Sequence, residues 1–443
     1  MQDPTPLSEE FPARMQIISG FHAVFPLLDI LFLLYYNVAI HAKTLYLLKG
    51  EYYYEKKVVS LLLAAAMTTA ALAGCGSSNG SSSSDASTGA DSTSATSASA
   101  STDGEKKDAA GEKIAMITDS GDITDESFNQ ITWETVCAYG DANGVEYEYY
   151  KPAEDTDEER INSIDLAVSE GATVVVMPGY LFGPAIAEEQ DTYPDVTFIA
   201  VDVTEGDIVK NGKAVDLGKN VYICSFEEEQ AGYLAGYAAV KDGYTSLGFL
   251  GGIAVPAVIR FGYGYVQGIN AAAEEDGVDV NVKYYYGGQF YGDDSITARM
   301  EGWYADGTQV VFACGGGIWT SALDAAETHD GKVIGVDVDQ RSKIGERCLT
   351  SAMKGLPSAI NNALDSYFSG NFSELGGTAQ QLGLKDGDYI GLLPIPNPGD
   401  SQPSHRISTE TVLAGIRDGS IEISSDTENQ PEVGSHVTVD YIS

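Results

Sequence analysis

The chain has 443 residues, which is enough for two domains with a sizeable core. Its 65 acidic and 25 basic residues give a formal net charge of −40. Such a surface repels the phosphates of nucleic acid and the headgroups of anionic lipid. The charge therefore argues against nucleic acid as a partner.

The first 47 residues precede the first segment that has a clear meaning. An apolar stretch at residues 17–48 is long enough to span a bilayer, but it contains Pro26, Asp29 and His41. We interpret residues 1–47 as an extension that arises from a mis-assigned start. Leu48 is the alternative initiator that this hypothesis names.

Residues 48–74 resemble a bacterial lipoprotein signal peptide. Lys56 and Lys57 open a charged segment, residues 58–71 form a short apolar run, and Leu-Ala-Gly leads directly to Cys75. This resemblance implies that cleavage precedes Cys75 and that Cys75 carries a lipid anchor in the membrane. The alternative is a chance Leu-Ala-Gly-Cys sequence within a transmembrane helix.

The segment that follows Cys75 is rich in Ser, Ala, Thr and Gly up to about residue 111. Such a segment cannot bury enough apolar surface to fold. Residues 75–111 are therefore predicted to be a lipidated cysteine followed by a flexible tether.

The folded part is predicted to begin at about residue 113 with a short apolar strand, residues 114–117. A loop with Asp119 and Asp125 follows, and a helix begins at Phe128 and Asn129. Ligands bind at the carboxyl ends of strands in open α/β sheets, so Asp119, Phe128 and Asn129 are candidate ligand-binding residues. The alternative for the two aspartates is helix capping and turn formation.

Strands and helices then alternate along the chain, which predicts α/β lobes with doubly wound, mostly parallel sheets. We expect a first lobe at residues 112–243 and a second at 244–352, with residues 353–443 as a return to the first lobe and a tail. The predicted strands are residues 145–150, 173–177, 196–201, 221–225, 246–250, 281–286, 309–312, 332–336, 349–353 and 389–393, and the predicted helices after the first are residues 157–169, 227–240, 357–368 and 409–417.

The layout of the first strand and helix returns in the second half of the chain. Phe261 opens a helix as Phe128 does, and the separation from Phe128 to Asp202 (74 residues) nearly equals that from Phe261 to Asp337 (76 residues). The repeat predicts two similar lobes that close on a ligand, each offering a Phe and an Asp at strand ends. The alternative is that both phenylalanines cover the cores beneath their helices.

Catalytic and metal-binding patterns are absent from the sequence after Cys75. The three histidines, His329, His405 and His436, form no HExxH motif, and no GxSxG occurs. The glycines at residues 315–317 lack the further residues of a phosphate-binding loop. We therefore predict no enzyme activity, no cofactor and no metal.

Several segments resemble the basic membrane protein family of substrate-binding lipoproteins of ABC transporters. They read TDSGDITDESFNQITWE, EEEQAGYLAG, GFLGGIAVPAVIRFGYGYVQG and VIGVDVDQ. The resemblance covers residues 113 to about 362 and, more weakly, the tail. It implies a two-lobed type I periplasmic-binding-protein fold, a ligand cleft between the lobes, and a permease with its ATPase as partners.

The resemblance also implies a ligand and its contacts, because characterised relatives bind purine nucleosides. It assigns the base to a sandwich between Phe128 and Phe261, with contacts from Asn129 and Asp119. It assigns the ribose and the nearby cleft to Asp293, Gly315, Gly316, Asp202 and Asp337. An aromatic face stacks on a base for roughly 1–3 kcal/mol, and carboxylates accept hydroxyl hydrogen bonds while repelling phosphate. The alternatives are a receptor of the same fold for a sugar or signal molecule, and a nucleoside hydrolase.

Overall fold

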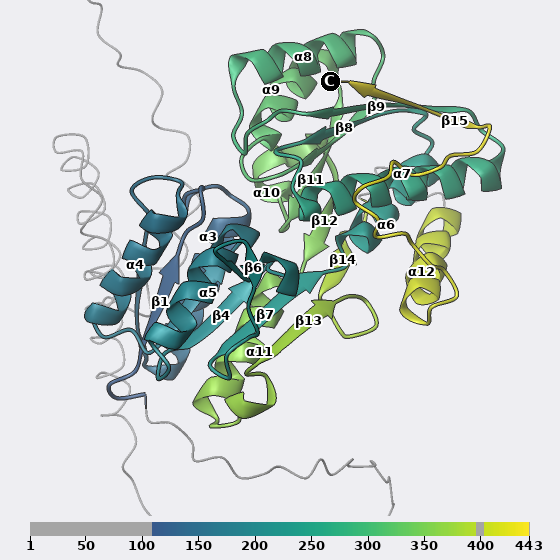
Figure 1. Cartoon of the computed structure of the whole chain (residues 1–443). Coiled ribbons are helices and arrows are strands. Elements are labelled where there is room, and N and C mark those ends of the chain that lie inside the picture. Colours follow the sequence, from purple (N-terminus) through teal and green to yellow (C-terminus); the bar gives the residue numbers. More distant parts are fainter. Residues whose placement is uncertain (1–108, 396–402, 443) are drawn as a thin grey trace, which may run out of the picture. The chain divides into compact units, whose positions relative to one another are not determined.

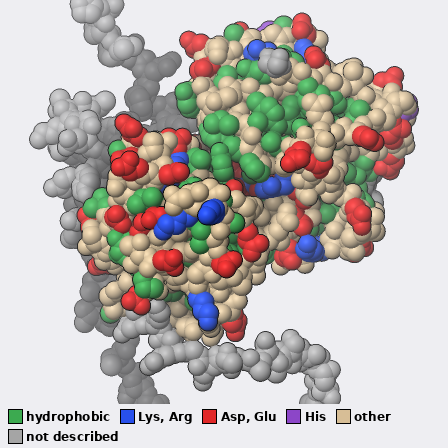
Figure 2. All heavy atoms as spheres, viewed as in Figure 1, with side chains coloured by type: hydrophobic (Ala, Val, Ile, Leu, Met, Phe, Trp, Pro, Cys, Tyr) green, Lys and Arg blue, Asp and Glu red, His purple; other side chains and the backbone are tan. Residues whose placement is uncertain are grey.

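The computed structural model describes residues 109–395 and 403–442, with the backbone alone for residues 403–409. The predicted extension, the signal peptide, Cys75 and most of the tether lie outside these residues. No helix in the described part of the chain is both long and apolar enough to cross a bilayer. Carboxylates are spread widely over the visible face of the molecule, as the net charge requires (Figure 2).

The first lobe is built on a six-stranded sheet in which every pairing is parallel (Figure 1). Its strand order is β13-β7-β4-β3-β1-β2. The strands are β1 (Lys113–Ile117), β2 (Glu146–Tyr150), β3 (Val174–Pro178), β4 (Thr197–Val201), β7 (Val221–Phe226) and β13 (Thr378–Leu382). Its helices are α3 (Phe128–Asn143), α4 (Asp157–Ser169), α5 (Gly183–Thr192) and α11 (Leu356–Phe368), and a two-stranded hairpin joins β5 (Val209–Lys210) to β6 (Lys213–Ala214).

The second lobe is built on a seven-stranded sheet that is parallel except at β14. Its strand order is β14-β12-β11-β10-β8-β9-β15. The strands are β8 (Ser246–Gly251), β9 (Val280–Tyr286), β10 (Val310–Cys314), β11 (Lys332–Asp337), β12 (Cys348–Lys354), β14 (Ile390–Leu392) and β15 (Val437–Ile442). The other helices are α6 (Glu228–Lys241), α7 (Pro256–Asp276), α8 (Asp294–Ala305), α9 (Trp319–His329), α10 (Arg341–Ile344) and, in the tail, α12 (Pro403–Arg417).

The prediction of two α/β lobes with mostly parallel sheets is confirmed, but two boundaries were wrong. Helix α6, which we assigned to the first lobe, packs against α7, the first helix of the second lobe. Residues 353–443 divide between the lobes: α11 and β13 return to the first, whereas β14 and β15 join the sheet of the second. Hydrophobic patterns identified these elements, but pairing partners distant in sequence decided which sheet each one joins.

The packing of α6 on α7 depends on glycines in both helices. A Cβ atom at Gly232 would lie 2.0 Å from Phe261 O, and one at Gly268 would lie 2.0 Å from Tyr233 O. The two backbones therefore approach too closely for any side chain at these positions. This contact explains the small residues that the sequence shows along residues 227–240.

The chain passes between the two sheets at three places, after β7, after β12 and after β13. Several separate crossings restrict the lobes to rotation about one axis, which is the design of a hinge. The parallel strands bring their carboxyl ends, and the loops that follow them, to the cleft between the lobes.

Candidate functional site

A cavity of about 200 Å³ lies at the carboxyl ends of the strands and is lined by residues of both lobes. Ligand pockets of roughly 300–1,000 Å³ hold drug-sized molecules, so this cavity suits a small one. It brings together eight of the nine ligand-binding residues predicted from the sequence: Asp119, Phe128, Asn129, Asp202, Phe261, Gly315, Gly316 and Asp337.

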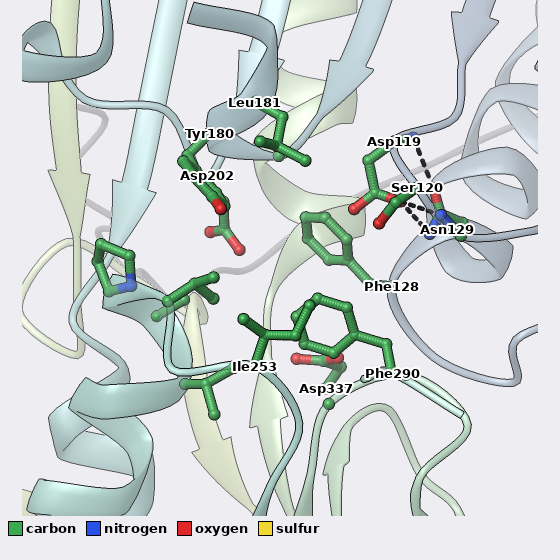
Figure 3. Close-up of a pocket in the computed structure, with 18 of the residues that line it drawn as sticks. Asp119, Ser120, Phe128, Asn129, Tyr180, Leu181, Asp202, Ile253, Phe290 and Asp337 are labelled. Atoms are coloured by element: carbon green, nitrogen blue, oxygen red, sulfur yellow. Dashed lines mark hydrogen bonds between the residues drawn. The ribbon is translucent and has the colours of Figure 1, made fainter. Parts of the chain in front are cut away.

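One end of the cavity is formed by Asp119, which follows β1, and Asn129, which lies in the first turn of α3 (Figure 3). Asp119 Oδ1 accepts hydrogen bonds from Gly121 N at 2.6 Å and from Asn129 Nδ2 at 2.9 Å. Burial raises the pKa of Asp119 to about 6, although these hydrogen bonds oppose the shift. The pair presents a carboxylate and an amide in fixed positions.

The turn that carries Asn129 is held by Asp125. The Asp125 carboxylate accepts hydrogen bonds from the backbone N–H groups of Ser127 (2.9 Å), Asn129 (2.9 Å) and Gln130 (3.0 Å). These N–H groups include those at the start of α3, which have no partner within the helix. Asp125 therefore fixes the helix start, the structural role that the sequence left open for it.

Two aromatic rings from different lobes project into the cavity, and one of them was not predicted. Phe128 extends from the start of α3, and Phe290 extends from the loop after β9 (Figure 3). Both rings are partly buried and pack against the core on one side. Glycines make room for Phe290: a Cβ atom at Gly252 would lie 2.5 Å from its ring, and one at Gly315 would lie 2.9 Å from it.

Phe261 was predicted as the second stacking ring, but the structure places it in the core. The side chain is only 2% exposed, and its ring meets the ring of Phe312 edge-on at 6.1 Å. Phe261 is among the residues that line the cavity, but burial leaves its ring little exposed surface for stacking. The repeat predicted a helix that opens at Phe261, but α7 begins at Pro256, so Phe261 lies in the second turn of the helix and its ring packs toward the sheet.

Asp293 was predicted to hold a ribose, but it does not line the cavity. Its carboxylate caps α8 by accepting hydrogen bonds from Ser295 N at 2.9 Å and Ile296 N at 2.8 Å. These hydrogen bonds lower the pKa of Asp293, which is an exposed group. An aspartate at a helix N-terminus commonly satisfies the free N–H groups in this way.

The opposite end of the cavity contains a buried lysine, Lys354, at the end of β12. Its ammonium group lies 2.5 Å from Asp202 Oδ2 and 3.0 Å from Glu228 Oε1. The ring centroids of Phe128 and Phe261 are 5.3 Å and 5.6 Å away, within the range of cation–π attraction. Lys354 therefore connects a carboxylate of the first lobe to one at the start of α6.

Lys354 and the buried carboxylates around it change one another's pKa values. Burial opposes the charge of Lys354, but attraction to Asp202, Glu228 and Asp337 outweighs it and raises the lysine pKa. Burial also raises the pKa of Asp202 to about 6, while Lys354 acts against that shift. Glu228 is buried as well, yet attraction to Lys354 and Arg260 holds its pKa below the usual value.

Asp202 and Asp337 occupy corresponding positions in the two lobes. Asp202 follows β4 and Asp337 ends β11, and both have a left-handed backbone, with φ of 58° and 64°. That conformation is uncommon for a residue other than glycine and is frequently found at functional sites. Asp337 Oδ2 accepts a hydrogen bond from Ser127 Oγ at 2.6 Å, so it also contacts the first lobe.

Sequence reasoning missed Phe290, Lys354 and Arg260, which all line the cavity. The rule that ligands bind at strand ends could have suggested two of them, because Phe290 follows β9 and Lys354 ends β12. Arg260 carries no such signal: it lies within α7 and pairs with Glu228 Oε2 at 2.6 Å.

Comparison with known proteins identifies the class of protein to which this chain belongs. Residues 112–425, more than two thirds of the chain, match the family model described as "ABC transporter substrate-binding protein PnrA-like". The chain is 30% identical over 300 residues to the "ABC transporter nucleoside-binding protein BmpA" of Lactococcus lactis, covering 62% of this chain and 80% of the relative. It is 26% identical over 296 residues to "Basic membrane protein B" of Borreliella burgdorferi, covering 65% and 82%.

Solved structures support the fold. An ABC transporter solute-binding protein from Aeropyrum pernix superposes with a TM-score of 0.61 at 18% identity, covering 71% of this chain and 94% of that chain. One from Conexibacter woesei gives a TM-score of 0.58 at 22% identity, covering 71% and 99%. The molecule thus has the two-lobed type I periplasmic-binding-protein fold.

Such proteins are extracytoplasmic receptors that pass a small ligand to a permease and its ATPase, and they are not enzymes. The extent of the family match and the cleft between the lobes both indicate a substrate-binding protein. The chain belongs to the PnrA-like family of ABC transporter substrate-binding proteins.

Proposed function

We propose that the cavity binds a nucleoside, with a purine base held between Phe128 and Phe290. The observation that carries this proposal is that two partly buried rings from different lobes line one cavity with the Asp119–Asn129 pair. Two aromatic faces favour a flat heterocycle, and each stacking contact contributes roughly 1–3 kcal/mol. A sugar without a base would use neither ring fully.

The carboxylate and amide of Asp119 and Asn129 supply polar contacts for the edge of the base. An ionised carboxylate accepts N–H hydrogen bonds, which are stronger than those between neutral groups. The half-buried position of Asp119 keeps water from competing with such contacts. We propose that this pair recognises ring nitrogens or exocyclic groups of the base.

The opposite end of the cavity suits the ribose. Asp202 Oδ1 is buried and receives no hydrogen bond from the described residues, so it can accept one from a hydroxyl group. Asp337, Gly315 and Gly316 also line the cavity. We propose that these four residues contact the sugar hydroxyls.

The charges of the cavity favour a nucleoside over a nucleotide. Its two basic residues are already paired: Lys354 with Asp202 and Glu228, and Arg260 with Glu228. The lining otherwise includes several carboxylates, among them Asp119, Asp155 and Asp337, which repel phosphate. The name of the Lactococcus lactis relative as a nucleoside-binding protein agrees with this choice.

Isothermal titration against inosine, guanosine, adenosine and ribose tests the proposal. We expect heat with at least one purine nucleoside and none with ribose alone. Phe128→Ala should weaken binding at least about tenfold, since one stacked ring contributes roughly 1–3 kcal/mol, while the melting temperature changes little. Flat titrations with all three nucleosides and a response to ribose would instead identify a sugar receptor.

We also propose that Cys75 carries a lipid anchor, on the basis of the Leu-Ala-Gly-Cys sequence that follows a short apolar run. Cells fed with labelled palmitate should incorporate the label into the wild-type protein and not into Cys75→Ala. Cys137→Ala is the control and should retain the label. Equal labelling of wild type and Cys75→Ala would exclude this anchor.

A further inference from the structure

The two lobes touch at one rim of the cavity through a small set of polar contacts. Glu126 and Ser127 of the first lobe meet Asp337, Gln340 and Lys343 of the second. Ser127 Oγ donates to Asp337 Oδ2 at 2.6 Å, Gln340 Nε2 donates to Glu126 O at 3.1 Å, and Lys343 Nζ lies 2.7 Å from Glu126 Oε1.

We propose that the contacts of Glu126 with Gln340 and Lys343 form a latch that keeps the lobes closed over a bound ligand and sets its rate of release. The proposal rests on the function proposed above, because it concerns the same cavity. It assigns a role to two groups that do not line that cavity: the Glu126 and Lys343 side chains.

The latch is continuous in sequence with the ligand-binding residues on both sides. Glu126 and Ser127 directly precede Phe128 and Asn129, while Gln340 and Lys343 follow Asp337 within six residues. A movement that brings Phe128 and Asp337 to opposite sides of a ligand therefore also brings the latch residues together.

Gln340 and the backbone of Glu126 are each held by contacts within their own lobe. Gln340 is buried, and its Oε1 accepts a hydrogen bond from Val336 N at 3.1 Å. Glu126 has a left-handed backbone with φ of 55°, and its N–H donates to Gln130 Oε1 at 3.0 Å. A left-handed glutamate costs energy that the surrounding contacts must offset, which is typical of a functional position.

The seam beside the latch is hollow. A second cavity of about 360 Å³ lies between the two lobes there, and its lining includes Glu126, Glu134, Asp339 and Lys343. Packed side chains do not join the lobes across this space. Glu126 and Lys343, which form the ion pair of the latch, both border this space.

Charge reversal at Glu126 or Lys343 tests the latch without changing a residue that lines the cavity. Lys343→Glu places two carboxylates together, and Glu126→Lys places two ammonium groups together. We expect each variant to release inosine about three- to fivefold faster, from the loss of a half-exposed ion pair, with the association rate nearly unchanged. The double variant Glu126→Lys/Lys343→Glu restores the pair and should release inosine within about twofold of the wild-type rate.

A matched control reverses a charge within one lobe. Lys283 pairs with Asp306 at 3.1 Å, and both residues belong to the second lobe. Lys283→Glu should release inosine at the wild-type rate. If Lys343→Glu and Glu126→Lys also release inosine at the wild-type rate, or if the double variant remains as fast as the singles, the latch is wrong.

Small-angle X-ray scattering of the ligand-free proteins keeps this test separate from the proposed function. If wild type binds none of the nucleosides, the proposed function fails, and the latch is then judged by scattering alone. We expect Lys343→Glu to have a larger radius of gyration than wild type and Lys283→Glu to match wild type. If wild type binds no nucleoside, equal radii of gyration for wild type, Lys343→Glu and Lys283→Glu would overturn the latch.

Discussion

The ammonium group of Lys354 lies 2.5 Å from Asp202 Oδ2 and joins the last residue of β12 to the residue that follows β4. One strand belongs to the sheet of the second lobe and the other to the sheet of the first. The pair therefore stands where the chain crosses between lobes. It links the hinge to the cavity, which both residues line.

Removing the charge of Lys354 should strongly destabilise the protein. Lys354→Met leaves Asp202 and Glu228 buried without their cation, and breaking a buried pair from one side costs about 3–5 kcal/mol. Urea unfolding measures this loss. Lys283→Met, which breaks an exposed pair with Asp306, should cost less than about 1 kcal/mol. Equal losses in the two variants would show that Lys354 is not the centre of a buried network.

The two phenylalanines of the second lobe should respond in opposite ways to truncation. Phe290→Ala removes a ring of the cavity, so we expect at least about tenfold weaker inosine binding with a small change in melting temperature. Phe261→Ala leaves a void in the core and should cost about 3–5 kcal/mol of stability. Calorimetric titration measures the inosine affinity of both variants, and denaturant unfolding measures their stability. A stability loss for Phe290→Ala as large as that for Phe261→Ala would contradict a ligand-facing role.

Glu229 makes the stability of the protein dependent on pH. Burial and the neighbouring Glu228 raise the pKa of Glu229 to about 8, above its ordinary value of 4.5. Because the pKa is raised, the folded state favours the protonated form of Glu229. The stability that this preference contributes is fully present below pH 4.5 and is lost as the pH rises through about 8. Glu229→Gln, which stays neutral, should therefore match wild type near pH 4 and be more stable by about 1–3 kcal/mol near pH 9.

Urea unfolding at the two pH values checks the role of Glu229. Glu301→Gln, at an exposed position of α8, is the control for loss of a surface carboxylate and is measured at the same two pH values. If the difference between Glu229→Gln and wild type is the same at pH 4 and pH 9, the glutamate does not titrate within this range.

Two helical glycines should show opposite effects when replaced by alanine. Gly268→Ala forces a Cβ atom to within 2.0 Å of Tyr233 O and should cost about 1–3 kcal/mol or more by separating α6 from α7. Gly302→Ala on α8 meets no atom within 4 Å and should add about 0.5–1 kcal/mol, because alanine favours helix. Thermal unfolding compares them, and a stable Gly268→Ala would show that the helix pair can separate at little cost.

Local patterns predicted most of the elements that frame the cavity. The strand before Asp119, the helix that begins at Phe128, and the strand ends at Asp202 and Asp337 lie where the sequence indicated. Parallel strands place their carboxyl ends at one edge of each sheet, so Asp119, Asp202 and Asp337 could be assigned to a common cleft before their distances were known. Eight of nine predicted residues line the cavity, although Phe261 among them lies within α7 and not at a strand end.

The failures concern the direction of side chains and contacts between distant segments. Phe261 follows the repeat in sequence, but it lies in the second turn of α7 with its ring in the core, and Phe290 presents a ring instead. The family resemblance assigned Asp293 to the ribose, but its carboxylate accepts hydrogen bonds from N–H groups of its own helix.

The sequence by itself determined the alternation of strands and helices, the two-lobed plan and the acidic strand ends, since each depends on residues near one another in the chain. Only the tertiary structure decided which ring faces the cavity, which sheet the tail joins, and that Lys354 stands between Asp202 and Glu228. These features arise from packing and ion pairs between residues far apart in the chain, and no local pattern encodes which of the possible partners a buried group will meet.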